Sequence, residues 1–422
     1  MGIVKDNTED TGPRLPWAGK RVRPENVEEE LSRFWCLAAD NMRISQNIRV
    51  RTSVLNFIIC APDIASAQRA SQLLRDLSST NLARVFLVIL DTDDQTSSIS
   101  TWVTLRSFPI VSDIMRHHFE QITLLASGAQ ADDIPYLIRS LLKPDLPVYL
   151  WWLSDLPASD TALNRLIAFS DRVIVDSHKF LRLEESFRTL SALMQTCPDC
   201  AISDLSWGRI TPWRELVAQF FDVPEYRSYL QGVNAIEVEH AVPALDGSLL
   251  SQQDETTHSP TQALLLATWL KTLLGWQFSR GNTLEEHDPA TGIYAWHMAR
   301  TGQLGRTRQP TRTATVLNTG GEIALRPRIQ PNLRPGSICM VRLSSLWDGK
   351  SAVFTINRAD NDTEHVLTSV ELDEGPRPTR LINLPAMLPE SELLHNELEI
   401  TGHDDIYEEV LQEVFSLLAE ES

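Results

Sequence analysis

Several common functional elements are missing from this sequence of 422 residues. No run approaches the roughly 18 uninterrupted apolar residues of a membrane-spanning helix, so we expect no membrane association. Residues 1–16 are polar and of mixed charge, without the apolar core of a secretory signal, which favours a cytoplasmic protein. The closely set glycines of dinucleotide folds and P-loops are absent, as is the Gly-x-Ser-x-Gly nucleophile elbow. We therefore expect no catalytic residue, no cofactor and no metal.

Positive charge is also scarce. The chain has 38 Lys and Arg against 56 Asp and Glu, a formal net charge of -18. Because phosphate contacts need a basic face, this balance argues against nucleic-acid binding. The 11 acidic residues of residues 388–422 stand without any Lys or Arg. Two interpretations stay open: a solvated, solubilising end, or an acidic arm that docks on a basic partner surface.

Cysteine is sparse, with five residues, which fits a reducing compartment. The one local motif with thiol chemistry is Cys197-Pro-Asp-Cys200. Two thiols at this spacing can form a small-ring disulfide, and the arrangement can lower the pKa of one of them. A zinc site would need two further ligands, and a thioredoxin-type catalyst would place the pair at the start of a helix rather than after one. Incidental thiols, a regulatory disulfide and a metal site remain the three interpretations.

Other polar residues give weak signals. His117 and His118 are adjacent, so their side chains diverge and make a poor chelate. Asp155, Asp176 and Asp204 lie near predicted strand ends, where acid–base chemistry is conceivable. We favour helix capping or loop hydrogen bonding for all three aspartates.

The hydrophobic periodicity predicts an α/β fold: a mainly parallel sheet flanked by helices in an N-terminal domain, followed by a C-terminal α+β domain with an antiparallel sheet. We predict four segments: a disordered stretch (1–25), the α/β domain (26–201), the α+β domain (202–387) and an acidic tail with a terminal amphipathic helix (388–422). Predicted helices cover 26–42, 63–77, 133–142, 161–170, 183–194, 211–221, 260–274 and 406–418. Predicted strands cover 49–61, 84–91, 99–108, 121–126, 148–152, 173–176, 234–240, 314–317, 322–327, 337–343, 352–357, 365–372 and 380–384.

Tryptophan is abundant, with 11 residues. Trp151 and Trp152 end the buried strand 148–152, and Trp207 and Trp213 flank the predicted helix start at Thr211 and Pro212. Because Trp and Arg are enriched in interface hot spots, these four residues and Arg214 are candidates for partner contact. Core packing is the alternative. Alternation along a strand turns Trp151 and Trp152 to opposite faces, so both are buried only if both faces of the sheet are covered.

Three segments in order resemble the OpcA family of glucose-6-phosphate dehydrogenase assembly proteins of cyanobacteria and actinobacteria. They are residues 145–152 (Asp-Leu-Pro-Val-Tyr-Leu-Trp-Trp), 171–177 (Asp-Arg-Val-Ile-Val-Asp-Ser) and 204–215 (Asp-Leu-Ser-Trp-Gly-Arg-Ile-Thr-Pro-Trp-Arg-Glu). The motifs Leu15-Pro16-Trp17 and Leu274-Gly275-Trp276 fit as well. The clear resemblance covers residues 47–276.

The resemblance implies a role without catalysis. Such proteins bind glucose-6-phosphate dehydrogenase of the oxidative pentose phosphate pathway, favour its active oligomer and raise its activity, and in cyanobacteria this control is linked to thioredoxin. The family offers no catalytic residue to carry over. We infer Cys197 and Cys200 as the redox pair from their spacing, with Cys36 and Cys339 as rivals. An activator needs no chemistry of its own, because a tenfold preference for the active form corresponds to about 1.4 kcal/mol.

Two other classes compete with this hypothesis. One is a nucleotide- or small-molecule-binding enzyme that uses the carboxyl end of the sheet, where sites of open α/β folds lie. The missing glycine loops count against it. The other is a thiol–disulfide redox protein that acts through Cys197 and Cys200.

Overall fold

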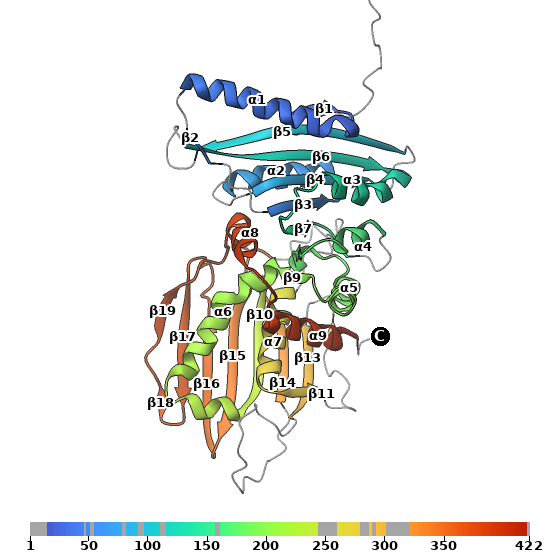
Figure 1. The fold of residues 1–422 in the computed structure, drawn as a ribbon. Coiled ribbons are helices and arrows are strands. Elements are labelled where there is room, and N and C mark those ends of the chain that lie inside the picture. The colour runs from blue at the N-terminus through green and yellow to red at the C-terminus, as the bar shows by residue number, and fades with distance from the viewer. Residues whose placement is uncertain are drawn as a thin grey trace, which may run out of the picture. The chain divides into compact units, whose positions relative to one another are not determined.

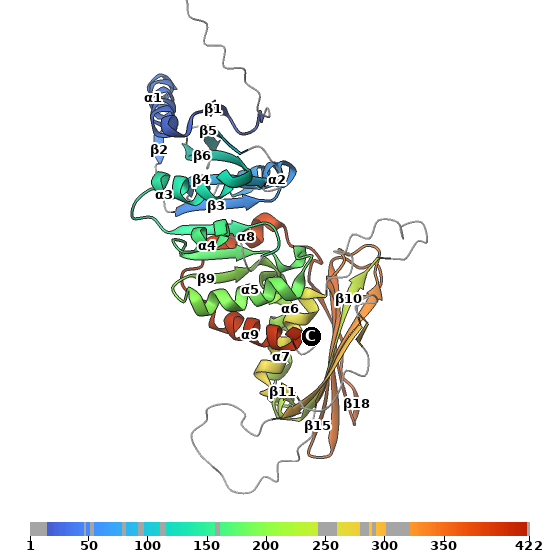
Figure 2. The same ribbon diagram turned by 90° about the vertical axis from the view of Figure 1, so that its right-hand side faces the viewer.

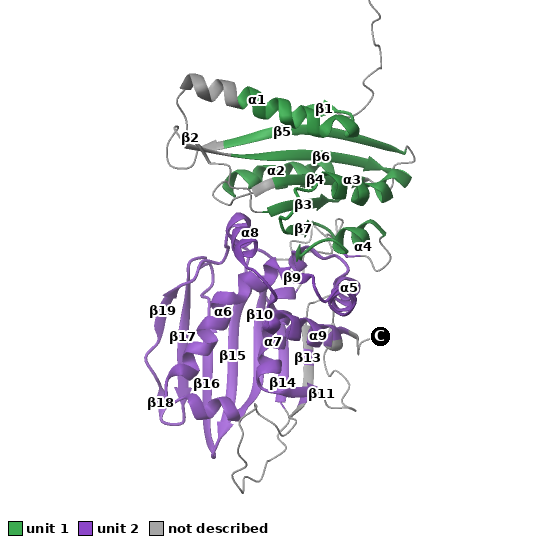
Figure 3. Cartoon of the chain, viewed as in Figure 1, with its two compact units in different colours: residues 1–154, 159–174 green, residues 155–158, 175–422 purple. Residues whose placement is uncertain are grey.

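A computed structural model describes most of the chain (Figure 1). The described residues are 15–45, 48–50, 55–77, 82–91, 97–109, 115–156, 161–243, 260–278, 287–288, 293–300 and 321–419. They divide into two compact units (Figure 3): unit 1 comprises 1–154 and 159–174, and unit 2 comprises 155–158 and 175–422. This boundary lies within the segment 26–201 predicted as the α/β domain.

Unit 1 is built on a parallel-rich sheet. Its strands are β1 (Lys20–Val22), β2 (Ile48–Val50), β3 (Leu55–Ala61), β4 (Leu82–Asp91), β5 (Ser98–Pro109), β6 (Met115–Ser127), β7 (Val148–Trp152) and β8 (Arg172–Val175). They lie in the order β1-β5-β6-β4-β3-β7-β8, with β2 beside β6. The pairs from β6 to β8 are parallel, whereas β5 joins β6 and β1 in antiparallel pairs. The predicted parallel sheet is thus confirmed, with an antiparallel edge added.

Helices cover this sheet. They are η1 (Pro24–Asn26), α1 (Val27–Ser45), α2 (Ile64–Asp76), η2 (Gly128–Asp133), α3 (Ile134–Leu141) and α4 (Thr161–Ile167). Helix α1 packs on β5, and α2 packs on β3 and β4 (Figure 1). Every residue of β3 and β7 is buried, because a parallel strand with both faces covered has no solvent side. Asp63 caps α2 by accepting the Ser66 N–H at 2.7 Å.

A buried ion cluster lies inside unit 1. The Arg84 side chain is 1% exposed and donates from Nε to Glu120 Oε2 at 2.7 Å, while its Nη1 pairs with Glu28 at 2.5 Å. Glu120 also accepts from Trp35 Nε1 at 2.6 Å and pairs with Lys143 at 3.2 Å. Burial would raise the pKa of Glu120, but these cationic and donor groups hold it below its usual value. The cluster thereby links α1 to the sheet interior.

The prediction of disorder over residues 1–25 is wrong for its second half. Leu15 and Ala18 are buried, and Lys20–Val22 forms strand β1 against β5. The charged residues of this segment suggested disorder. An edge strand pairs through its backbone groups, however, and tolerates charged side chains. Residues 1–14 lie outside the described residues.

Unit 2 contains the second sheet. Its strands are β9 (Ala201–Asp204), β10 (Val233–Val242), β11 (Trp276–Phe278), β12 (His287–Asp288), β13 (Ile293–Arg300), β14 (Gly321–Ile329), β15 (Ile338–Trp347), β16 (Lys350–Asn357), β17 (His365–Leu372), β18 (Gly375–Pro376) and β19 (Arg380–Asn383). All but β9 form a sheet of order β11-β13-β14-β10-β15-β16-β17-β18, with β12 beside β13 and β19 beside β17. The expected strand at 314–317 lies outside the described residues.

The predicted antiparallel character of this sheet is confirmed except at its centre. Strands β10 and β14 pair in parallel, with Ile236 opposite Ile323. A parallel pair needs a crossover connection, and the chain between these strands includes helix α7.

The helices of unit 2 are η3 (Ser177–Lys179), α5 (Leu183–Thr196), α6 (Leu205–Asp222), η4 (Arg227–Gly232), α7 (Thr261–Leu273), α8 (Glu390–Glu399) and α9 (Asp405–Ala419). Helices α6 and α7 cover one face of the second sheet (Figure 2). Helix α7 ends close to the predicted end at residue 274, and the φ of 64° at Gly275 is the left-handed conformation that glycine tolerates. In the described part of the chain, no helix combines the length and apolar character needed to cross a membrane.

Helix α6 begins earlier than predicted. We expected Thr211 as its N-cap with Pro212 in the first turn, but the helix starts at Leu205, and Asp204 caps it by accepting the Ser206 N–H. Pro212 therefore lies inside the helix, where it lacks the usual backbone donor. Thr211 Oγ1 donates to the Trp207 carbonyl at 3.2 Å in the same stretch.

The acidic C-terminal segment is part of the core of unit 2. The expected terminal helix is confirmed by α9, which packs against α5 and α7. Its apolar stripe of Tyr407, Val410, Leu411 and Val414 is buried. The interpretation of this segment as a solvated end is wrong for α8 and α9, because the abundance of carboxylates masked the helical spacing of the apolar residues. The docking of an acidic arm on a partner stays a prediction.

Candidate functional site

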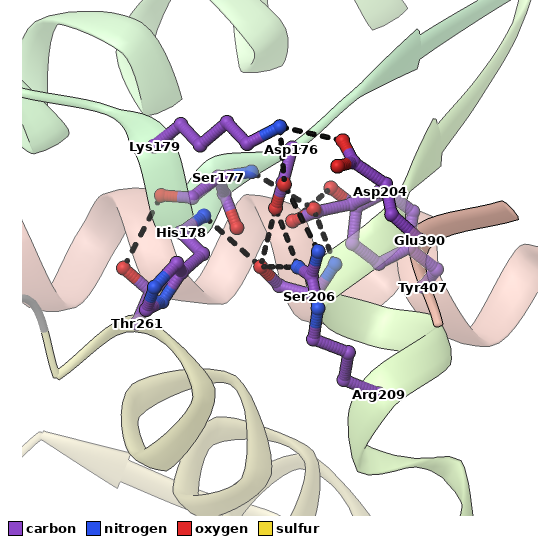
Figure 4. A network of polar contacts seen from close by, with 10 residues as sticks. All are labelled: Asp176, Ser177, His178, Lys179, Asp204, Ser206, Arg209, Thr261, Glu390 and Tyr407. Carbon is purple, nitrogen blue, oxygen red and sulfur yellow. Dashed lines mark hydrogen bonds and ion pairs between the residues drawn. The ribbon is translucent and has the colours of Figure 1, made fainter. Parts of the chain in front are cut away.

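Unit 2 contains a buried polar network at the start of helix α6 (Figure 4). Asp176 follows strand β8, Asp204 ends β9, and both point toward the first turns of α6. Helices α7, α8 and α9 contribute Thr261, Glu390 and Tyr407. Segments far apart in the sequence therefore meet around two buried carboxylates.

Asp176 contacts two cationic side chains of the network. Arg209 Nη1 and Nη2 donate to the two carboxylate oxygens at 2.5 and 3.0 Å, a bidentate arrangement. Lys179 Nζ lies 3.4 Å from Asp176 Oδ2 and 2.5 Å from Glu390 Oε1. Burial alone would raise the pKa of Asp176, but the Arg209 and Lys179 charges hold it well below its usual range. Asp176 is therefore a permanent anion.

Asp204 lies in a different environment although it is as deeply buried. Its Oδ1 accepts the N–H groups of Ser177 and Ser206 at 3.0 and 2.9 Å, and the Tyr407 hydroxyl donates to its Oδ2 at 3.4 Å. No cation pairs with it directly among the described residues. Burial raises the pKa of Asp204 to about 6 despite these hydrogen bonds, and the negative charge of Asp176 adds to the shift.

His178 is held neutral nearby. The backbone N–H of His178 donates to Ser206 Oγ at 3.0 Å, and Ser206 Oγ lies 3.4 Å from Asp176 Oδ1. Burial lowers the pKa of His178 to about 4, and the positive charge of Arg334 acts in the same direction, whereas Asp176 opposes it. An uncharged imidazole at neutral pH adds no positive charge to the network.

The C-terminal segment closes this region. Trp207 Nε1 donates to Asp404 Oδ2 at 2.8 Å, and the Trp207 ring lies 5.5 Å from that of Tyr407. The Arg214 guanidinium also stacks on the Trp207 ring, 3.6 Å from its centre. These contacts attach the start of α6 to the segment that leads into α9.

The network's geometry favours a structural role for its carboxylates. Asp204 is occupied by backbone donors, and Asp176 by Arg209. Asp155 accepts the N–H groups of Leu181 and Arg182 at 2.8 and 3.2 Å. The preference for capping or loop hydrogen bonding is thus confirmed for Asp155 and Asp204, whereas Asp176 is held by its ion pair with Arg209 and caps no helix with its side chain.

The structure places the predicted partner-contact tryptophans in the interior. Trp151 and Trp152 are 1% and 4% exposed in unit 1, and Trp151 stacks on Phe57 at 6.3 Å. Both faces of the sheet are therefore covered at this strand. Trp207 and Trp213 are buried in α6, and Arg214 on the same helix is half-buried. The role of these residues in partner contact stays a prediction.

The predicted redox pair follows helix α5, as expected. Cys197 is the C-cap of α5, and the Cys200 N–H donates to the Cys197 carbonyl at 3.1 Å, so a tight turn joins the two residues. Cys197 is half-buried, Cys200 is buried and both are free thiols. Of the rivals, Cys36 is exposed on α1, whereas burial raises the pKa of Cys339 to about 12 and disfavours its reactive thiolate.

Within the described ranges, no group of three or more His, Cys, Asp and Glu side chains is placed to hold a metal ion. Sequence reasoning missed three arginines that line one small cavity beside the network, Arg209, Arg334 and Arg358. They come from α6, a turn and the end of β16, and no local motif links them. It also missed α8, which supplies Glu390.

Two family models match successive parts of the chain. The family model described as glucose-6-phosphate dehydrogenase subunit N-terminal domain matches residues 74–192, and the model of the subunit's C-terminal domain matches residues 200–411. Two cyanobacterial proteins named as OxPP cycle protein OpcA are also similar. The Synechocystis sp. protein is 32% identical over 178 residues, 42% of this chain and 33% of that protein. The Nostoc punctiforme protein is 30% identical over 158 residues, 37% of this chain and 30% of that protein. The matched part of the chain thus spans about a third of the length of these relatives.

The similarity to solved structures is weak. An aldose-aldose oxidoreductase from Caulobacter crescentus aligns with a TM-score of 0.43 and 12% identity over 87% of this chain and 98% of that chain. An NAD binding oxidoreductase from Klebsiella pneumoniae aligns with a TM-score of 0.45 and 10% identity over 87% and 95%. A likeness at this level carries no conclusion about activity.

Proposed function

Because this chain belongs to the OpcA family of glucose-6-phosphate dehydrogenase subunits, we propose that it binds glucose-6-phosphate dehydrogenase, assists assembly of the active oligomer and activates the enzyme allosterically. The observation that carries this proposal is the match of both family domains, in their own order, to residues 74–192 and 200–411. The chain itself catalyses no reaction in this proposal. It acts by binding the active form of the enzyme more tightly than the inactive form.

The buried carboxylates support a binding role. Asp176 and Asp204 are committed to Arg209, to backbone donors and to Tyr407, and these contacts order α6 and the C-terminal helices. A general acid or base must reach the proton it transfers, and both side chains are at most 2% exposed. Such a network provides a rigid scaffold for a contact surface, which limits the entropy lost on association.

The experiment combines binding with kinetics. The purified chain is mixed with purified glucose-6-phosphate dehydrogenase, and the complex is sized by gel filtration with light scattering. We expect co-elution, a shift of the enzyme to a larger or more uniform oligomer, and a lower KM for glucose 6-phosphate. Separate elution together with an unchanged KM would refute the proposal. The chain alone, assayed with glucose 6-phosphate and NADP, is expected to show no turnover.

The predicted interface residues enter this proposal in two ways. Because the four tryptophan rings are buried, we propose that they influence enzyme binding through the packing of β7 and α6 rather than by direct contact. Arg214 is half-buried, so its outer edge can reach a partner while it stacks on Trp207. We expect Arg214→Ala to weaken enzyme binding by roughly tenfold, as hot-spot truncations do. Arg342→Ala, which removes a 46% exposed arginine of the second sheet, is the matched control.

Thiol control is the second part of the proposal. Oxidation of Cys197 and Cys200 would join their sulfurs in a disulfide, with loss of two protons and transfer of two electrons to a disulfide oxidant such as oxidised thioredoxin. The half-buried Cys197 is the accessible thiol for the mixed disulfide. Closing the disulfide ring would strain the turn that follows α5. Helix α5 packs against α9, so this strain could reach the C-terminal helix.

Alkylation after treatment with oxidised thioredoxin tests this step. We expect protection of Cys197 and Cys200, detected by peptide mass spectrometry, and a changed affinity for the enzyme that Cys197→Ser with Cys200→Ser abolishes. Cys36→Ser is the control, since Cys36 is exposed but has no partner cysteine at close spacing. Unchanged alkylation of Cys197 and Cys200 would rule out the redox role and leave the binding proposal intact.

A further inference from the structure

A small cavity in unit 2 is lined by three arginines and, among the described residues around it, by no carboxylate. Arg209, Arg334 and Arg358 share its wall with the polar side chains of Gln262 and Ser337. The remaining wall is apolar or backbone and includes Trp213 and the segment 384–388. Its volume is about 30 Å³, which suits a few atoms of ligand or ordered water rather than a whole sugar or base.

The arginines differ in how far their charge is balanced. Arg209 is paired with Asp176 in a bidentate contact. The Arg334 guanidinium makes no ion pair or hydrogen bond with the described residues, although it is only half-exposed. Burial lowers the pKa of Arg334, and the like charge of Arg209 lowers it further. The negative charges of Asp176 and Glu390 act in the opposite direction, but no described carboxylate pairs directly with the Arg334 guanidinium.

Arg358 is fixed in place. It is 1% exposed, and its Nη2 and Nη1 donate to the carbonyls of Leu384 and His365 at 2.8 and 3.3 Å. Its Nε is buried without a hydrogen-bond partner in the described structure. Leaving a buried charged donor unsatisfied is costly, so such a group commonly marks the place of a ligand or ion. Gln262 and Ser337, each 6% exposed, add neutral donors at the same wall.

From these groups we propose that the cavity is a binding site for a phosphate group, carried by a phosphate monoester or present as free phosphate. Planar guanidinium groups bind phosphate oxygens through paired, charge-assisted hydrogen bonds. A tetrahedral oxyanion matches the cavity in size and offers several acceptors to donors that come from different directions. An anion there also relieves the repulsion between Arg209 and Arg334. This site is independent of the proposed action on the dehydrogenase.

A carboxylate ligand is the nearest alternative. It has two acceptor oxygens in one plane, which satisfy one guanidinium bidentately, whereas a phosphate group presents oxygens to more than one. Arrangement of three arginines around a single cavity therefore favours the phosphate. Acetate serves as the probe that separates these ligands.

Calorimetric titration of the full chain alone, at constant ionic strength, tests the site with orthophosphate, glucose 6-phosphate and acetate. We expect saturable binding of at least one phosphate probe and much weaker binding of acetate. Tighter binding of glucose 6-phosphate than of orthophosphate would assign a monoester whose organic part lies outside the cavity, and the reverse order would assign free phosphate. Absence of saturable binding for both phosphate probes would overturn the proposal.

The decisive variant is Arg334→Gln. Because Arg334 is half-exposed and unpaired, we expect the variant to fold and its unliganded melting temperature to stay equal or rise as the repulsion with Arg209 is removed. We expect its phosphate affinity to fall roughly tenfold or more, the usual effect of losing a charge-assisted contact. Arg342→Gln removes a half-exposed arginine that does not line the cavity, and this variant is expected to bind like the wild type. Equal affinities in the two variants would contradict the site, whatever the outcome with the dehydrogenase.

Discussion

Replacement of Asp204 by asparagine is expected to make the stability of the chain respond differently to pH. Burial raises the pKa of Asp204 from its ordinary value of 3.8 to about 6. The folded protein therefore keeps this proton up to about pH 6, whereas the unfolded chain loses it near pH 4. Between these values the native state binds more protons, so the free energy of unfolding falls as pH rises through this window.

The magnitude follows from the size of the shift. A shift of about two units corresponds to about 3 kcal/mol, present as a penalty in the wild type above about pH 6 and absent below about pH 4. Asparagine has no titration and resembles the protonated carboxyl: its oxygen can accept the Ser177 and Ser206 N–H groups, and its NH2 can donate to the Tyr407 oxygen. The variant should thus gain up to about 3 kcal/mol relative to wild type as pH rises from about 4 to 7.

His178 has the opposite dependence but does not obscure the effect. Burial lowers its pKa from 6.5 to about 4, so its contribution to stability is lost as pH falls through that range. In the wild type this loss opposes the Asp204 effect and flattens the profile. In the difference between Asp204→Asn and wild type the His178 contribution largely cancels, because both proteins carry it.

The assay is urea unfolding of both proteins, followed by tryptophan fluorescence and circular dichroism, at steps between about pH 4.5 and about pH 7.5. About 2 kcal/mol of the expected change falls within this range. Asp199→Asn, which alters an exposed aspartate of the same unit, is the control and should give a flat difference. A flat or falling difference for Asp204→Asn would refute the account of this buried carboxyl.

Three further predictions concern packing. Leu411→Ala in α9 should cost about 2–5 kcal/mol of unfolding free energy, since Leu411 is fully buried. Ile406→Ala, at a 53% exposed position of the same helix, should cost far less. Equal urea midpoints for the two variants would show that the segment is solvated. Glu120→Gln should lower the free energy of unfolding by about 3 kcal/mol, because Arg84 loses its most buried partner. Glu185→Gln, at a surface ion pair, should change the free energy of unfolding by less than about 1 kcal/mol. Gly321→Ala should lower the melting temperature, because an added Cβ would overlap the Trp276 ring.

Much of the fold could be predicted because its strongest elements have strong local signals. Strand β7, Val148–Trp152, has the predicted bounds, since an apolar run between prolines leaves little choice of register. The start of α6 could not be placed, because Asp204 and Thr211 are both good N-caps, and only tertiary contacts with Ser177 and Tyr407 decide between them.

The candidate site was harder to predict. Asp176 and Asp204 stood out by their position at strand ends, but Arg334 lies in a turn and Arg358 after a strand, where arginine is unremarkable. Their convergence with Arg209 depends on how the second sheet packs against α6. The tryptophans were visible as a group in the sequence, yet their burial follows from coverage of both sheet faces and of α6, which no local pattern reports.

Titration of the chain into purified glucose-6-phosphate dehydrogenase, at a glucose 6-phosphate concentration below the enzyme's KM, is the most direct test of the central claim. We predict a rate that rises with the concentration of the chain and saturates at a fixed ratio of the two proteins. A rate that stays constant to large excess, with a correctly folded chain, would contradict the account.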